Sequence, residues 1–141
     1  MEINGVAHVI LTVSSMARSG PFYSALLEHM GLTRVVDLDD YLYYVGGRTA
    51  VGLRPAAEEH AEVPFDQGRV GLHHVCFRAR NRDDVDSVHA LAEKLGAVIV
   101  HEPREEPWVP GYYSVLFEDP DGIRIEVNHV PGKGVFETRA P

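Results

Sequence analysis

The stretch GLHHVCFRA, residues 71–79, is repeated in pattern by GVAHVILTV, residues 5–13. When the first glycines of the two stretches are aligned, His8 falls on His74. Each stretch is followed by a segment with helical spacing that ends in an apolar residue and a glycine. Self-similarity over so long a period predicts two copies of one supersecondary unit rather than a solenoid.

The length and composition predict one globular domain without a disulfide. The 141 residues carry 13 basic and 21 acidic side chains, a formal charge of −8, which excludes nucleic acid as a partner. No apolar run approaches the ~20 residues that span a bilayer, and the N-terminus MEINGVAHV lacks a basic signal region. With Cys76 as the single cysteine, we expect a cytoplasmic protein with no membrane partner.

Both halves follow the order β-α-β-β-β. Alternating and helical apolar patterns predict strands at 6–13, 32–37, 41–45 and 49–54, and then at 71–79, 97–101, 112–118 and 123–129. A helix follows the first strand of each half, and Pro21 indicates that the first one starts late, near Ser19, or is distorted. We predict an α+β fold with a first module at 1–56, a linker at 57–70, a second module at 71–130 and a tail at 131–141.

Strand alternation predicts a shared face for three potential metal ligands. If apolar neighbours such as Val9, Val75 and Val127 pack under the helices, then His8, His74 and Glu126 face the other way. Two imidazoles and a carboxylate form a facial triad with open positions, which suits Fe²⁺, Mn²⁺, Ni²⁺ or Zn²⁺. The alternative is that both histidines are core residues and that Glu126 is an exposed strand residue.

Five motifs resemble the vicinal oxygen chelate superfamily, also called the glyoxalase/bleomycin resistance/dioxygenase proteins. They are AHVILTV (7–13), PFYSALLEHMGL (21–32), LHHVCFRA (72–79), KLGA (94–97) and, most specific of all, VLFEDPDGIRIEV (115–127). The resemblance implies two βαβββ modules that form a cupped mixed sheet around a divalent metal held by His8, His74 and Glu126. It also implies a homodimer, sometimes with modules exchanged between chains.

One departure from the family pattern narrows the implied activity. Gly52 stands where glyoxalase I enzymes and methylmalonyl-CoA epimerases of this family carry a fourth ligand, and glycine has no donor. The three-ligand site that remains resembles those of ring-cleaving dioxygenases and fosfomycin-modifying transferases. The transferases differ by a threonine where this chain has Ile10, and by a potassium loop that PWVPGYY (107–113) does not resemble.

Aromatic and polar residues near the last strands complete the predicted site. We expect Tyr112 or Tyr113 to act as catalytic acid or base, and Trp108, Arg124 and Asn128 to line the substrate. The alternative is that these aromatics are core or dimer-interface residues and that Arg124 pairs with an acid.

The predicted function is that of a metal-dependent lyase, isomerase or extradiol-type dioxygenase acting on a small oxygenated metabolite. The alternative is a protein of the bleomycin-resistance type, which sequesters a drug without catalysis. The acidity of the chain suits a cationic drug. A metal-free structural dimer is the third possibility.

Overall fold

The computed structural model describes residues 1–3 and 5–132, and the chain divides into two compact units between Pro64 and Phe65. The boundary falls inside the predicted linker, which also contains a short 3₁₀ helix, η1 (Glu58–His60). Residues 133–141 of the predicted tail lie outside the described residues. Among those described, no helix is long and apolar enough to span a membrane.

The first unit is a four-stranded mixed sheet with one helix. In chain order it contains β1 (His8–Val13), α1 (Met16–His29), β2 (Thr33–Leu38), β3 (Tyr41–Gly46) and β4 (Thr49–Pro55). The strand order is β1-β4-β3-β2, in which β1 is parallel to β4 and the remaining pairs are antiparallel.

The second unit repeats this topology. It contains β5 (Val75–Arg78), α2 (Arg82–Lys94), β6 (Val98–Glu105), β7 (Tyr113–Glu118) and β8 (Arg124–His129). The strand order is β5-β8-β7-β6, again with one parallel pair, β5 with β8. The predicted α+β fold of two βαβββ modules is therefore confirmed.

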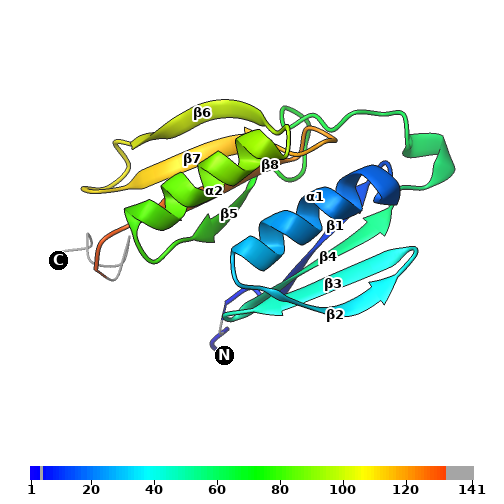
Figure 1. The fold of residues 1–141 in the computed structure, drawn as a ribbon, viewed down its shortest axis with the longest axis horizontal. Coiled ribbons are helices and arrows are strands. Elements are labelled where there is room, and N and C mark those ends of the chain that lie inside the picture. The colour runs from blue at the N-terminus through cyan, green and yellow to red at the C-terminus, as the bar shows by residue number, and fades with distance from the viewer. Residues whose placement is uncertain (4, 133–141) are drawn as a thin grey trace. The chain divides into compact units, whose positions relative to one another are not determined.

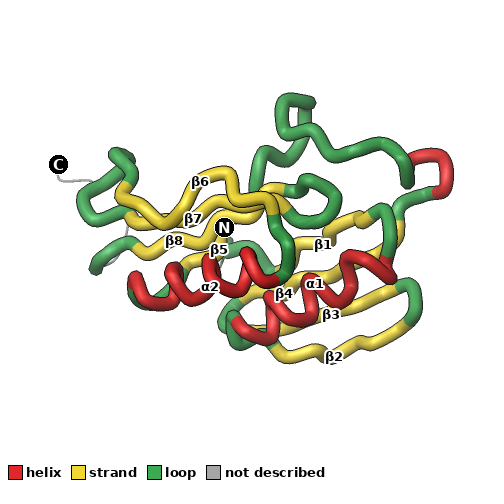
Figure 2. Tube along the Cα trace, turned by 45° about the horizontal axis from the view of Figure 1, so that its top comes forward, coloured by secondary structure: helices red, strands yellow, loops and turns green. Residues whose placement is uncertain are grey.

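Each helix covers one face of its own sheet, as Figures 1 and 2 show for both units. The buried side chains on α2 are Val85, Val88 and Ala92, and those on the sheet are Val115, Phe117, Ile125 and Val127. Burial of each larger apolar side chain contributes roughly 1.5–3 kcal/mol. The alternate residues of β7 and β8, Glu126 among them, face away from α2.

Of the two alternatives that Pro21 suggested for α1, a late start near Ser19 is not the one observed. The helix begins at Met16, because the Ser15 hydroxyl accepts a hydrogen bond from the Arg18 amide and caps the first turn. Pro21 lies inside the helix, where it removes one intrahelical hydrogen bond. The apolar side chains Phe22, Tyr23, Leu26 and Leu27 are all buried beyond it, and their packing offsets that loss.

Strand β6 is longer than predicted. The predicted strand ends at His101, yet residues 102–105 also belong to β6. The pairing of β6 with β7 shifts between Ile99 and His101 and again between His101 and Arg104. These irregularities let the edge strand accommodate a proline and interrupt the period-two pattern that predicts strands.

Candidate functional site

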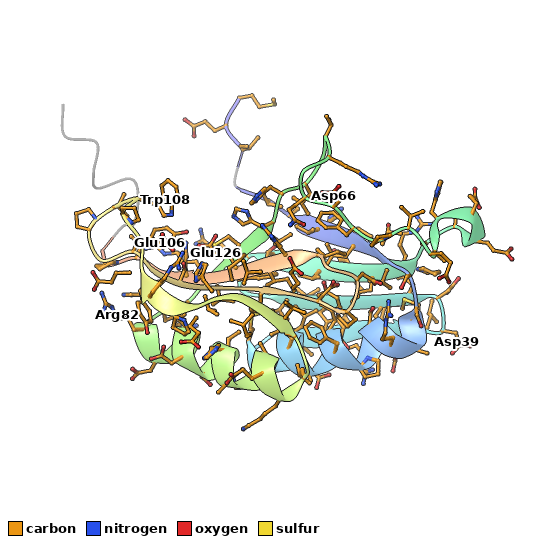
Figure 3. The ribbon with its side chains drawn as sticks, turned by 90° about the horizontal axis from the view of Figure 1, so that it is seen from above. Asp39, Asp66, Arg82, Glu106, Trp108 and Glu126 are labelled. Carbon is orange, nitrogen blue, oxygen red and sulfur yellow. The ribbon has the colours of Figure 1, made fainter. Side chains whose placement is uncertain are left out.

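A tight turn places Glu126 on β8. The Asp119 carboxylate accepts hydrogen bonds from the amides of Asp121 and Ile123, both at 2.8 Å, and Gly122 adopts a φ of +83°. This turn delivers the chain into β8 in a fixed register, with Glu126 between Cys76 on β5 and Leu116 on β7. Figure 3 shows Glu126 on the face of the second sheet opposite α2.

The structure brings His74 and Glu126 together on that face. The Nε2 atom of His74 lies 3.1 Å from Oε2 of Glu126, and their side chains are 35% and 12% exposed. Among the described residues, no third His, Cys, Asp or Glu joins them to form a group that could hold a metal. Two of the three predicted ligands are therefore adjacent within one unit.

The distance between these two donors fits a shared metal ion. Imidazole nitrogen and carboxylate oxygen bind divalent ions such as Zn²⁺ at about 2.0–2.2 Å, so two such donors on one ion lie about 3 Å apart at an octahedral angle and about 3.4 Å apart at a tetrahedral one. The observed separation is 3.1 Å. The donor set is also the borderline nitrogen and hard oxygen combination that Fe²⁺, Mn²⁺, Ni²⁺ and Zn²⁺ accept.

His8 lies in the first unit, exposed at the start of β1. Its ring is 6.4 Å from that of Tyr43, in an edge-to-face arrangement, on the sheet face that also carries Ile10. On the same face, a Cβ atom at Gly52 would lie 2.6 Å from Cδ1 of Ile10. Position 52 therefore offers no metal ligand, and the Ile10 side chain occupies the space beside it.

Tyr112 contacts Glu126 directly. Its hydroxyl donates to Oε1 of Glu126 at 2.5 Å and accepts from Nδ2 of Asn128 at 2.7 Å. Burial, followed by the hydrogen bond to Glu126, raises the pKa of Tyr112 well above its ordinary value. The phenol therefore stays protonated and donates a hydrogen bond to the carboxylate.

Tyr113 points to the other side of the sheet. Its hydroxyl donates to Asp86 of α2 at 2.8 Å, and the Arg82 guanidinium lies 4.8 Å from its ring centroid. The hydrogen bond to Asp86 is the main cause that raises the pKa of Tyr113. Of the two tyrosines predicted to be catalytic, the structure brings only Tyr112 to Glu126.

The predicted substrate-lining residues have different positions. Asn128 lies beside Tyr112 on the Glu126 face. Arg124 is paired with Glu118 at 3.1 Å. Trp108 lies in the loop between β6 and β7 (Figure 3), and its side chain is 72% exposed. Asn128 alone among the three contacts a residue that touches Glu126.

The Cys76 thiol faces Glu126 across the β5–β8 pair. Although the residue retains exposed surface, desolvation of the sulfur, followed by the negative charge of Glu126, raises the pKa of Cys76 to about 12. The sulfur is therefore a protonated thiol near neutral pH and a poor metal ligand in this state.

Two features of this face escaped the sequence prediction. The first is His73, whose Nδ1 lies 2.8 Å from Nδ1 of His74, although strand alternation with Val75 and Phe77 would place it on the opposite face. The second is a polar group on β6 and the loop after it. It comprises His101, Arg104 and Glu106, in which Arg104 Nε donates to Glu106 Oε1 at 2.6 Å and His101 Nε2 lies 3.8 Å from that oxygen. Register shifts bring His101 opposite Leu116, and therefore onto the Glu126 face, and no sequence signal marks those shifts.

Comparisons with known proteins agree with this architecture. The chain is 27% identical over 122 residues to the uncharacterized protein YqjT of Bacillus subtilis (strain 168), covering 85% of this chain and 94% of that one. It is 27% identical over 128 residues to the metallothiol transferase FosB of Staphylococcus epidermidis, covering 91% and 83%. A crystal structure of a glyoxylase/bleomycin resistance protein/dioxygenase domain from Frankia sp. EAN1pec matches with a TM-score of 0.75 and 25% identity, covering 94% and 96%.

The family model of these proteins matches residues 5–127, which include both βαβββ units almost completely. The resemblance seen in the motifs is thereby confirmed over most of the chain. The chain belongs to the Glyoxalase/Bleomycin resistance protein/Dioxygenase superfamily.

Proposed function

We propose that this protein is an enzyme that uses one divalent metal ion, held by His8, His74 and Glu126, to bind a small substrate through adjacent oxygen atoms. The observation that carries the proposal is the 3.1 Å separation of His74 Nε2 and Glu126 Oε2 on the sheet face opposite α2. Glu126 is only 12% exposed, so its carboxylate carries part of a desolvation cost, which a shared cation would offset.

The chemistry follows from the residues around the pair. When bound, the ion would supply a Lewis acid that polarises the substrate oxygens. Glu126 is only 12% exposed, so its negative charge is poorly screened by water and favours a cation strongly. The Tyr112 hydroxyl is protonated and donates its hydrogen bond to Glu126, so it is not the proton acceptor in the reaction. The acceptor is another group, supplied by the substrate, by water or by a co-substrate.

The number of ligands favours some reaction classes over others. With glycine at position 52, three protein ligands leave positions free for a chelating substrate and a second reactant. This arrangement suits a lyase or isomerase, a transferase such as the metallothiol transferase relatives, or an extradiol-type dioxygenase. Iron in the purified protein would favour dioxygen chemistry, whereas nickel, zinc or manganese would favour lyase or transferase chemistry.

Elemental analysis of protein purified without chelator or metal-affinity resin tests the proposal. We expect about one divalent ion per chain in the wild type and nearly none in His8→Ala or Glu126→Gln. His60→Ala and Glu59→Gln, in the short helix η1, are matched controls that should keep the ion. A wild type that binds no Fe²⁺, Mn²⁺, Ni²⁺ or Zn²⁺ even when these are supplied would overturn the proposal.

A second candidate function is sequestration of a cationic aromatic drug without catalysis. It is favoured by Tyr41 and Tyr43, whose rings stack with centroids 5.9 Å apart beside His8, and by the formal charge of −8. Fluorescence titration of metal-free protein with bleomycin discriminates the two functions. Tight binding that survives Glu126→Gln but is lost in Tyr43→Ala would favour sequestration.

A further inference from the structure

We propose that Tyr112 is a positioning residue, which fixes the Glu126 carboxylate so that one oxygen stays bound to the phenol and the other is presented beside His74. This inference rests on the proposed metal site and assigns a task to a residue that does not itself bind the ion. It replaces the expectation that Tyr112 acts as acid or base.

The two oxygens of Glu126 have different partners. Oε1 accepts a hydrogen bond from the Tyr112 hydroxyl, with the two oxygens 2.5 Å apart, and Oε2 lies 3.1 Å from His74 Nε2. A carboxylate without such a partner can rotate about its terminal torsion, which is broad and roughly two-fold. The phenol removes this freedom, so Oε2 is held on the His74 side before any ion arrives.

Asn128 fixes the direction of the hydrogen bond. Its Nδ2 donates to the Tyr112 oxygen at 2.7 Å, and Asn128 stands two residues after Glu126 on the same face of β8. Because the phenol oxygen accepts from Asn128, its single proton is left to donate to Glu126. The chain Asn128 to Tyr112 to Glu126 thus has one consistent donor order.

The backbone around Tyr112 is also fixed. Its amide donates to the Val109 carbonyl at 3.1 Å, and its carbonyl accepts from the Glu106 amide at 2.9 Å. The preceding Gly111 has a φ of +76°, and a Cβ atom there would lie 2.8 Å from Cγ of Pro131. Only glycine fits this turn, so the loop delivers the phenol to a defined place.

Tyr113→Phe offers a matched control, because it removes one phenol hydroxyl from the neighbouring residue. Its hydroxyl donates to Asp86 of α2, not to Glu126. Calorimetric titration with Zn²⁺ on metal-free full-length protein measures the dissociation constant for wild type, Tyr112→Phe and Tyr113→Phe. Thermal unfolding of the metal-free variants checks that all three are folded.

We expect Tyr112→Phe to weaken Zn²⁺ binding about tenfold or more, the usual effect of losing a partner of a metal ligand. Tyr113→Phe should bind as the wild type does. Co²⁺ bound to Tyr112→Phe should show a shifted visible absorption spectrum, because the carboxylate binds in a different mode. If Tyr112 only stabilised the fold and did not orient Glu126, the Co²⁺ spectrum of Tyr112→Phe would match that of the wild type.

The possible results separate this inference from the proposed function. If wild type binds Zn²⁺ and Tyr112→Phe binds it equally well with an unchanged Co²⁺ spectrum, the positioning role is wrong and the metal site stands. If wild type binds neither ion, both are overturned. Weaker binding in Tyr112→Phe but not in Tyr113→Phe supports the inference.

Discussion

His74 Nε2 and Glu126 Oε2 lie 3.1 Å apart although their residues are separated by most of the second unit. The parallel pairing of β5 with β8 brings them together, because Cys76 is in register with Glu126 and His74 precedes β5 by one residue. The same strand pairing that closes the core under α2 therefore assembles two metal donors on the opposite face.

His73 should support His74 through its second ring nitrogen. If His74 presents Nε2 to an ion, its Nδ1 carries the proton and donates to Nδ1 of His73, 2.8 Å away. We expect His73→Phe to weaken Zn²⁺ binding about tenfold by calorimetric titration, with His60→Phe as a control that has no effect. Equal affinities of His73→Phe and wild type would show that His73 has no such role.

The turn before Tyr112 should tolerate no side chain. Gly111 and Gly96 share a φ of +76°, but only Gly111 has an atom in the way, Cγ of Pro131 at 2.8 Å. Alanine at either position costs about 1–2 kcal/mol for the left-handed backbone. Urea unfolding should show a larger loss for Gly111→Ala, and Zn²⁺ binding should weaken only in that variant. Identical losses in both variants would contradict the assigned contact.

We expect a side chain at position 52 to compete for space with Ile10. A Cβ atom at position 52 would approach Ile10 Cδ1 to 2.6 Å and Tyr43 Cδ2 to 3.0 Å. Because Ile10 Cδ1 is the end of a flexible side chain that can turn aside, this overpacking should cost about 1 kcal/mol, the low end of the usual range. In a double-mutant cycle by urea unfolding, Ile10→Ala should relieve the part of the loss in Gly52→Ala that the tyrosines do not cause. Additive losses would mean that the two side chains do not compete for this space.

Cys76 should be slow to react while the protein is folded. Its pKa is raised from 9.0 to about 12, so the thiolate, which is the nucleophile, is scarce at pH 8. Alkylation by iodoacetamide should be well over tenfold faster in denaturant, and Glu126→Gln should accelerate it in the folded state. The pKa of Cys76 is higher in the folded state than in the unfolded state. The contribution of this shift to the free energy of unfolding is therefore complete below pH 9 and is lost as the pH rises toward 12. Equal rates in the folded and unfolded states would contradict the assigned environment.

The sequence predicted those features that repeat with a regular period. The helices, six of the eight strands and the shared face of His74 and Glu126 follow from apolar periodicity and strand alternation, whereas β5 starts at Val75 and not at Gly71 as predicted. The extension of β6 to Glu105 did not follow, because two register shifts break the alternation there. For α1 the sequence left open a late start near Ser19 or a distortion at Pro21, and the cap that Ser15 forms decides for the start at Met16.

Contacts made from loops were beyond sequence reasoning. Tyr113 begins β7 and alternation groups it with Val115 and Phe117 on the α2 side, but alternation does not show that the hydroxyl of Tyr112, in the preceding loop, reaches Glu126. The difference arises from the Gly111 turn and from strand alternation after it. Alternation with Val75 and Phe77 would place His73 on the helix side, but His73 precedes β5 and its ring contacts that of His74.

Anomalous diffraction from crystals grown with Zn²⁺, measured at the zinc absorption edge, tests the central claim most directly. The account predicts one strong peak about 2.0–2.2 Å from His74 Nε2, from Glu126 Oε2 and from a ring nitrogen of His8. The Tyr112 hydroxyl should remain bonded to the other oxygen of Glu126. A structure in which Zn²⁺ is absent from this place, with His74 bonded directly to Glu126, would contradict it.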